Sequence, residues 1–252
     1  MVSWQPDGNK ILLGHPDGSI QSWDWNSDQV VNFAASTAPN PLSCLELRPG
    51  GTEVAVCSPS YYDVGRSFIM DINSGQKSYD LPSDSSNIKW SPDGQTFADS
   101  SPFGLDLRAS SSALLWSAFK DFGSNYTLDW SSDGTRLVVS TAQAGKDIIL
   151  DAASGAELVN LVSYFSHGGT GYAPSDLQWQ PGSNTIAALS TDGVFVLWDA
   201  ENGRIIGSHP TELMYTNLRW SPDGQNLAFF GGLSNSDGSL VPIPVWKFNS
   251  PG

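Results

Sequence analysis

The sequence predicts an all-β fold built from six similar units. A turn motif of the form Trp-x-Pro/Ser-Asp-Gly occurs four times in the 252 residues, and two degenerate copies fill the gaps. The first positions of the six copies are Trp4, Leu47, Trp90, Trp130, Trp179 and Trp220. Repeats of this length that are made of short strands are typical of β-propellers. We therefore predict a six-bladed β-propeller.

The fifth repeat shows how one unit divides into strands. Four apolar or alternating segments are separated by turns that contain glycine; they cover 176–179, 185–190, 194–199 and 204–207. Glycine supplies the backbone freedom that tight hairpins need, so the pattern predicts four antiparallel strands. One such sheet is one propeller blade.

The first repeat has the same order, with predicted strands at 10–14, 19–24 and 29–33 after the strand that ends at Trp4. The repeats run along the whole chain without a change in composition. We predict one domain, residues 1–252, with blades that begin near residues 1, 43, 86, 126, 175 and 215.

The last repeat is shorter than the others. It ends in a third strand near Val245 to Phe248, and the four residues that follow are rich in Pro and Gly, so we predict a last blade of three strands. The first residues belong to an innermost strand and leave none to complete that blade. Pro242 and Pro244 suit the unpaired side of an edge strand, because neither has an N–H. The alternative is a strand that begins only at Pro244.

The charge balance restricts the partners. Twenty-six acidic against twelve basic side chains give a formal net charge of −14, which disfavours nucleic acid and anionic lipid and favours a basic or polar protein or peptide. No apolar run reaches membrane-spanning length and no leader precedes Trp4, so we expect no membrane insertion and favour a cytoplasmic location. The abrupt start at Met1 leaves open that the chain is a fragment.

The two cysteines are predicted to lie opposite each other. If the second repeat forms a hairpin that pairs Leu47 with Val54, Cys44 is paired with Cys57 on the next strand. We favour two small buried thiols over a cross-strand disulfide.

The ends of two third strands, Ile20 to Asp24 and Val196 to Asp199, resemble the Trp-Asp ending of WD-repeat proteins. The resemblance implies a hydrogen-bonded structural network in each such blade. Its candidate members are Asp17, Trp23, His167, Ser190, Asp192 and Trp198. The Trp-Ser-Pro-Asp-Gly turns, with longer second loops at 59–65 and 142–146, also resemble the WD-like repeats of TolB-type propellers.

Catalytic and metal motifs are not found. The three histidines form no His-Glu-x-x-His pair, and there is no Gly-x-Ser-x-Gly elbow. His167 and His209 are expected between a fourth strand and the next first strand, as structural residues. The recurring Asp-Gly pairs are one per hairpin and are interpreted as turns, not calcium ligands. We predict no catalytic residue, no metal and no cofactor.

Residues that break the repeat are the better functional candidates. Eight of the ten tryptophans share two repeat positions, which leaves Trp25 and Trp116. Aromatic residues also stand in two long loops, and we predict that these form a partner-binding rim. They are Tyr61, Tyr62, Tyr164, Phe165 and Tyr172. The alternative is a loop packed by its own tyrosines.

We expect a noncatalytic scaffold that binds a protein or peptide, not an enzyme. One alternative is an accessory propeller of a larger enzyme or transport complex. Another is a propeller hydrolase or a carbohydrate-binding lectin, which needs polar groups that converge at the axis.

Overall fold

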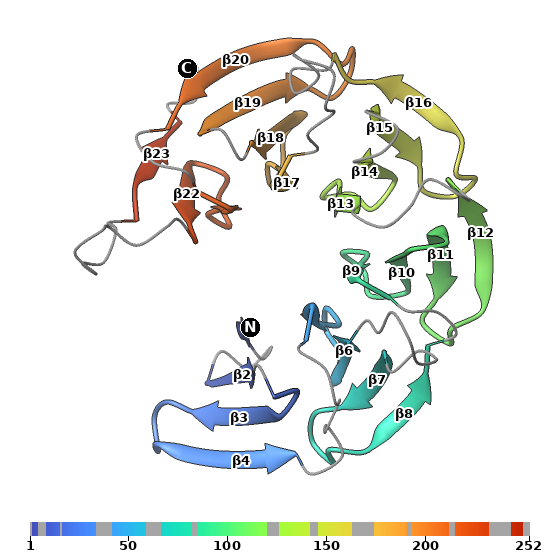
Figure 1. The fold of residues 1–252 in the computed structure, drawn as a ribbon, viewed down its shortest axis with the longest axis vertical. Helices are drawn as coiled ribbons and strands as arrows, with labels where there is room; N and C mark the ends of the chain where they lie inside the picture. Colours follow the sequence, from blue (N-terminus) through green and yellow to red (C-terminus); the bar gives the residue numbers. More distant parts are fainter. Residues whose placement is uncertain are drawn as a thin grey trace. The chain divides into compact units, whose positions relative to one another are not determined.

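The computed structural model confirms the all-β prediction. It describes residues 2–4, 9–15, 17–33, 42–58, 67–81, 85–119, 126–141, 146–162, 174–190, 193–211, 215–231 and 243–248. Within these ranges, 23 strands form six antiparallel sheets (Figure 1). Five sheets have four strands and the last has three, as expected for a six-bladed β-propeller with a short last blade.

The chain divides into two compact units, and the first covers Met1–Asn125. Its three sheets have their strands in sequence order. They are β1 (Val2–Trp4), β2 (Lys10–Gly14), β3 (Ile20–Asp24) and β4 (Gln29–Phe33); β5 (Cys44–Leu47), β6 (Glu53–Cys57), β7 (Phe68–Asp71) and β8 (Lys77–Asp80); and β9 (Asn87–Trp90), β10 (Thr96–Ser101), β11 (Gly104–Ala109) and β12 (Leu114–Ala118).

The second unit covers Tyr126–Gly252 and also contains three sheets. They are β13 (Tyr126–Trp130), β14 (Arg136–Thr141), β15 (Lys146–Asp151) and β16 (Glu157–Asn160); β17 (Asp176–Trp179), β18 (Thr185–Leu189), β19 (Val194–Asp199) and β20 (Ile205–Pro210); and β21 (Asn217–Trp220), β22 (Asn226–Phe230) and β23 (Val245–Lys247).

The repeated motif forms the turn between the first and second strands of a sheet. In β13–β14, the Ser131 hydroxyl donates to Asp133 Oδ1 at 2.6 Å, and the Thr135 N–H donates to the same oxygen at 3.0 Å. Gly134 adopts φ +69°, a conformation that favours glycine. The Ser131 hydrogen bond, with the bonds from Thr135, lowers the pKa of Asp133 to about 2. The motif is therefore hairpin chemistry, as its sequence indicates.

A second turn joins the third strand to the fourth. Asp151 ends β15, and its Oδ1 accepts hydrogen bonds from the Ser154 N–H at 2.8 Å and the Ser154 hydroxyl at 2.6 Å. The Gly155 N–H donates to the Asp151 carbonyl at 2.8 Å. Asp71 and Asp199 make corresponding turns at the ends of β7 and β19. The aspartate that ends the third strand thus reverses the chain into a fourth strand.

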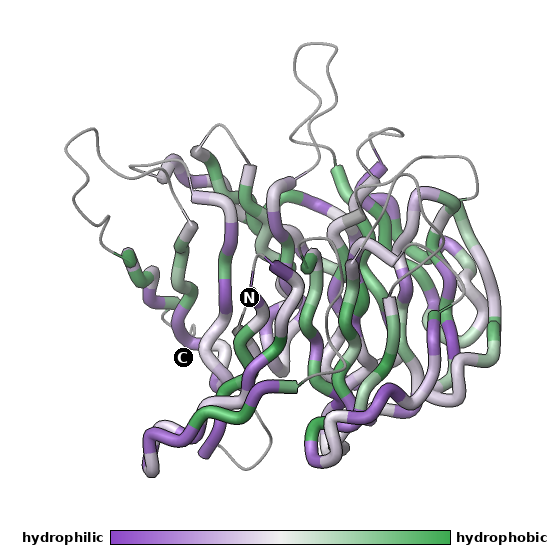
Figure 2. Tube along the Cα trace, turned by 60° about the horizontal axis from the view of Figure 1, so that its bottom comes forward, coloured by the Kyte–Doolittle hydropathy of each residue, from purple (hydrophilic) through white to green (hydrophobic). Residues whose placement is uncertain are grey.

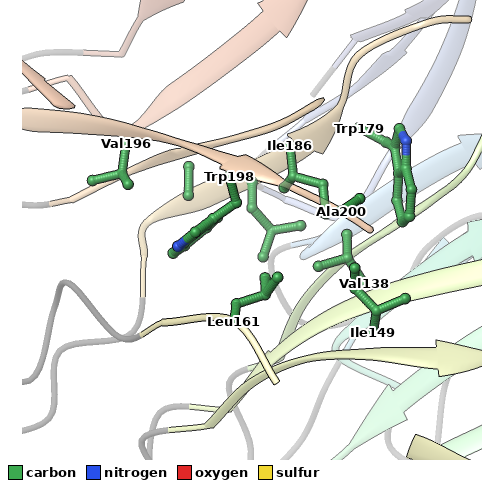
Figure 3. Packing of buried hydrophobic residues seen from close by; sticks show 10 residues of the cluster. Val138, Ile149, Leu161, Trp179, Ile186, Val196, Trp198 and Ala200 are labelled. Carbon is green, nitrogen blue, oxygen red and sulfur yellow. The ribbon is translucent and has the colours of Figure 1, made fainter. Parts of the chain in front are cut away.

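Apolar side chains fill the space between consecutive sheets of each unit. In the second unit, one cluster joins residues of β14 and β15 to residues of β17, β18 and β19 (Figure 3). Trp198 is fully buried there, and its indole N–H donates to the Val162 carbonyl at 3.0 Å. The hydropathy colouring in Figure 2 shows hydrophobic segments within the strands. Burial of apolar surface between sheets is the main favourable contribution to the free energy of folding.

The prediction that Cys44 and Cys57 are two buried thiols was wrong. The strand pairing places Cys44 opposite Cys57 as expected, but the two residues form a disulfide, with Cα atoms 4.7 Å apart. This separation lies in the range that disulfides require. Both residues are buried against β9 and β10. A cross-strand bond therefore joins β5 to β6.

Candidate functional site

The last sheet contains the strongest candidate for a binding surface. Its strands are ordered β21-β22-β23, so among the described strands β23 pairs only with β22. Ile243, Val245 and Trp246 are 64%, 54% and 39% exposed. Exposed apolar groups on an edge strand are typical of interaction sites or aggregation sites.

Comparison with the five four-stranded sheets shows what is unusual about Val245. The pairing between second and third strands gives the residue that occupies the same position in each of those sheets: Ser22, Ile69, Leu107, Ile149 and Leu197. All five are buried, with at most 8% exposed. Ile69, Ile149 and Leu197 lie in apolar clusters with residues of the next sheet along the chain, so in those sheets the next sheet covers this position.

The prediction that Pro244 faces the unpaired side of the edge strand was wrong. β23 begins at Val245, and the Phe229 N–H donates to the Pro244 carbonyl at 3.2 Å. The backbone of Pro244 therefore faces β22 and not the open edge. Because the N–H and C=O of one strand residue point to the same side, Val245 directs its own groups outward. Pro242 lies outside the described residues.

Aromatic rings support β23 from the side of the neighbouring sheet. The Trp246 ring lies 5.2 Å from Phe195 and 4.8 Å from His209, measured between centroids, and Phe195 lies 5.0 Å from Phe229. His209 was expected in a connection, but it lies in β20 opposite Phe195. The fourth strand extends to Pro210, three residues beyond the predicted end. Sequence analysis missed this cluster because its members come from four strands, β19, β20, β22 and β23, in two different sheets.

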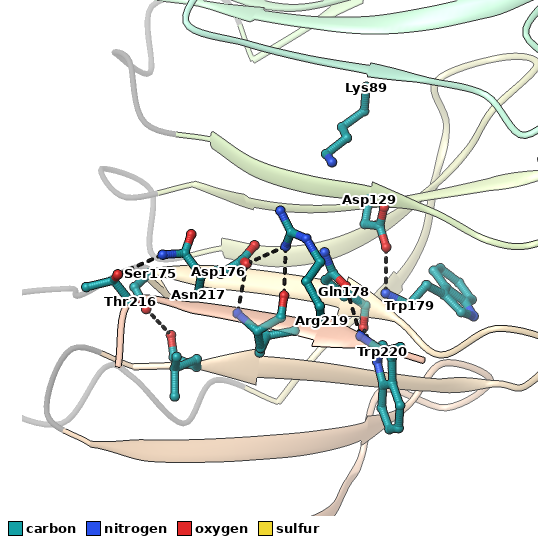
Figure 4. A network of polar contacts seen from close by, with 12 residues as sticks. Lys89, Asp129, Ser175, Asp176, Gln178, Trp179, Thr216, Asn217, Arg219 and Trp220 are labelled. Carbon is teal, nitrogen blue, oxygen red and sulfur yellow. Dashed lines mark hydrogen bonds and ion pairs between the residues drawn. The ribbon is translucent and has the colours of Figure 1, made fainter. Parts of the chain in front are cut away.

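Polar side chains link the first strands of consecutive sheets in the second unit (Figure 4). The Trp179 N–H donates to Asp129 Oδ2 at 2.8 Å, and the Leu218 N–H donates to Asp176 Oδ2 at 3.1 Å. Arg219 pairs with that same Asp176 oxygen at 2.8 Å. These groups are used in mutual contacts, so the network holds the strands together.

A shallow polar groove of about 660 Å³ lies beside Arg48 in the first unit. The Arg48 guanidinium contacts Glu53 at 2.6 Å and donates to the Gly94 carbonyl at 2.7 Å. Thr52 donates to Asp71 at 2.5 Å. Because its charged groups already bind one another, this groove is a weaker candidate than the open edge.

The structure places only some of the predicted site residues. The loop candidates Tyr61, Tyr62, Tyr164, Phe165 and Tyr172, with His167 and Asp192, lie outside the described residues.

The other members of the predicted network make the following contacts. Asp17 accepts from the Ser19 hydroxyl at 2.7 Å, and Trp23 donates to Asp28 at 3.0 Å. The hydrogen bond from the Ser19 side chain lowers the pKa of Asp17. Ser190 Oγ accepts from the Val194 N–H at 3.3 Å. The indole N–H of Trp23 therefore serves its own hairpin, not Asp17.

Two searches over the described ranges gave negative results. No three His, Cys, Asp or Glu side chains among the described residues are grouped so that they would hold a metal ion. Within the same ranges, no helix combines the length and hydropathy of a membrane span.

Comparison with known proteins supports a WD-like propeller. No protein-family model matches the chain. It is 33% identical over 81 residues to the WD repeat-containing protein AAC3 of Dictyostelium discoideum, an alignment that covers 29% of this chain. The chain matches only 16% of the length of that relative.

A solved structure of similar fold is the computationally designed Ika8 protein. The TM-score is 0.71 at 18% identity, and the alignment covers 98% of this chain and 70% of Ika8. At this level of identity the similarity supports the fold and says nothing of function.

Proposed function

We propose that this protein is a noncatalytic propeller scaffold that binds another protein or peptide, and that the open edge of β23 belongs to its binding surface. The observation that carries the proposal is the group of exposed apolar side chains on and just before β23, in which Ile243 is 64%, Val245 is 54% and Trp246 is 39% exposed. The similarity to a WD repeat-containing protein supports the same class of function.

The binding partner is proposed to be basic or polar overall. The net charge of −14 attracts such a partner over several ångströms and increases the association rate. Salt screens this attraction, so the association rate falls as ionic strength rises. The loops that contain Tyr61 and Tyr164 remain separate candidates for partner binding.

The test is quantitative binding of purified proteins that are recovered by crosslinking to the intact protein. Val245→Asp places a charge on an exposed side chain and is expected to weaken binding at least tenfold. Leu115→Asp is the matched control, because Leu115 is 52% exposed on β12. The proposal is overturned if no protein binds the wild type saturably, or if the purified chain turns over a substrate.

A second candidate function is that of an accessory propeller, of the TolB-like kind, within a larger enzyme or transport complex. It is favoured because the chain matches only 16% of the length of its WD-repeat relative. The flanking coding sequence tests it. A catalytic or transport domain in the same reading frame supports this candidate, and a reading frame that contains only the propeller contradicts it.

A further inference from the structure

The turn between β19 and β20 differs from the corresponding turns by one reactive residue. In the turns β7–β8 and β15–β16, the third residue after the aspartate is a serine, Ser74 or Ser154, whose N–H and hydroxyl donate to that aspartate. In the turn β19–β20 the same position is occupied by Asn202, which is followed directly by Gly203. Asparagine carries a side-chain amide that can be converted to an acid, and serine carries no such group.

The side chain of Asn202 is ordered by its own turn. Its N–H donates to Asp199 Oδ2 at 2.5 Å, and its Oδ1 accepts a hydrogen bond from the Arg204 N–H at 2.9 Å. Asn202 is also exposed, so solvent water and hydroxide reach the amide. The amide is therefore both held by the turn and open to reaction with solvent.

Gly203 supplies the nitrogen that can attack this amide. The backbone nitrogen of the residue after an asparagine can close a five-membered ring with the side-chain carbonyl carbon, and glycine places no Cβ in the way. The Gly203 N–H donates to the Asp199 carbonyl at 2.8 Å, so ring closure requires this turn to open. Asn73 provides an internal comparison, because it is exposed in the turn β7–β8 but precedes Ser74.

We propose that Asn202 is a site of deamidation, and that its conversion weakens the contact between the sheets β13–β16 and β17–β20. The Gly203 nitrogen bonds to the side-chain carbonyl carbon of Asn202, the bond from that carbon to the side-chain nitrogen breaks, and ammonia leaves with the Gly203 amide proton. The resulting succinimide adds one water. Hydrolysis at the side-chain carbonyl gives aspartate, and hydrolysis at the backbone carbonyl gives isoaspartate, whose main chain runs through the former side chain.

The aspartate product loses a hydrogen bond and adds a charge. An ionised carboxylate has no hydrogen to donate, so the bond to Asp199 Oδ2 disappears and two carboxylates lie next to each other. Glu201, whose N–H donates to Asp199 Oδ1 at 2.9 Å, adds a third acidic group to the same turn. Like charges at this separation repel each other and disfavour the folded turn.

The isoaspartate product also changes the contact between the two sheets. The Gly203 carbonyl accepts a hydrogen bond from the Val162 N–H at 2.8 Å, and a Cβ on Gly203 would clash with the Asn160 carbonyl oxygen. Isoaspartate inserts one extra carbon atom into the main chain before Gly203. The glycine then cannot keep its bonds to both Asp199 and Val162, so the packing between the sheets is weakened.

The test is incubation of the intact protein in mildly alkaline buffer, followed by peptide mapping with mass spectrometry and an isoaspartate-specific assay. Asn202 is expected to convert at least tenfold faster than Asn73, with release of ammonia and formation of both acidic products. Unfolding the chain in urea before incubation is expected to accelerate conversion of Asn202, because the Gly203 N–H is then released from Asp199.

Two variants separate the chemical change from its structural effect. Asn202→Ser restores the side chain of the turns at Ser74 and Ser154, and it is expected to keep the urea midpoint of the fresh protein through the same incubation. Asn202→Asp introduces the charge without the longer main chain. Its urea midpoint is expected to lie between those of the unmodified protein and the purified isoaspartate form.

Each outcome decides the inference. It is overturned if Asn202 converts no faster than Asn73 in the folded protein, or if the converted protein keeps the urea midpoint of the fresh protein. An equal fall of the midpoint in incubated Asn202→Ser also overturns it, since that variant has no amide at this position. Partner binding is measured separately with Val245→Asp, so this inference goes beyond the proposed function and can fail without it.

Discussion

The Trp246 indole and the His209 imidazole lie 4.8 Å apart between ring centroids, with their planes tilted by 44°. The two residues belong to β23 and β20, which are the last strands of two consecutive sheets. Phe195 contacts both rings. The short last sheet is therefore held to its neighbour by an aromatic cluster.

Replacement of Trp246 by alanine is expected to destabilise the protein by about 2 kcal/mol, because it removes the packing of a ring that is partly exposed. The measurement is urea unfolding. Trp25→Ala is the control, since Trp25 is 50% exposed in a turn, and a loss below about 1 kcal/mol is expected. Equal losses in the two variants would contradict a stabilising role for the cluster.

Two aspartates are expected to change stability with pH in opposite directions. Burial raises the pKa of Asp147 above its ordinary value of 3.8, although the hydrogen bond from Ser140 opposes this effect. Its contribution to stability is complete below pH 3.8 and is lost as pH rises through the folded-state pKa. Asp147→Asn should therefore raise the urea midpoint at neutral pH. The variant should also show a smaller fall in the urea midpoint as pH rises above 3.8.

Asp133 is the matched opposite case. Its pKa is lowered from 3.8 to about 2, so its contribution is present above pH 3.8 and is lost as pH falls toward 2. The carboxylate is exposed, and screening limits the effect of Asp133→Asn to below about 1 kcal/mol. Unfolding curves of both variants across this pH range test the signs, and a shift in the same direction for both would refute the assignment.

The disulfide between Cys44 and Cys57 closes a short loop with a sequence separation of 13. Chain-entropy arguments give about 3 kcal/mol of stabilisation for a loop of this size. Reduction is expected to lower the unfolding free energy by about that amount, and the Cys44→Ala/Cys57→Ala variant should become insensitive to reductant. Mass spectrometry after thiol alkylation should find the bond in protein made in an oxidising compartment. Free thiols in such protein would contradict it.

Alanine substitutions at Gly203 and Gly182 can be compared to measure the free-energy cost of a side chain at a closely packed glycine. Both have positive φ, +73° and +67°. A Cβ at Gly203 would clash with the Asn160 carbonyl oxygen, whereas a Cβ at Gly182 has no atom within 4 Å. Gly182→Ala is expected to cost about 1 kcal/mol from backbone strain alone. Gly203→Ala should cost about 3 kcal/mol or more, and equal thermal shifts would rule out the predicted contact with the neighbouring sheet.

Strand order and turns could be predicted because their causes are local. The Ser131 and Asp133 pair and the Asp151 turn are built from residues within five positions of one another, and glycine marks the positions of positive φ. The pairing of Cys44 with Cys57 also followed from one hairpin. Whether their sulfurs bond depends on the distance between the two side chains, which a two-residue pattern does not fix.

The sequence by itself determined the number of sheets, their strand order and the short last sheet, because a period of 40 to 49 residues and a repeated turn specify one supersecondary unit at a time. Tertiary structure decided which side of β23 Pro244 faces, where His209 lies and how exposed Val245 is. Exposure depends on what packs against a strand from elsewhere in the chain. The exposure of a strand residue is therefore decided by the tertiary structure and cannot be read from a single repeat.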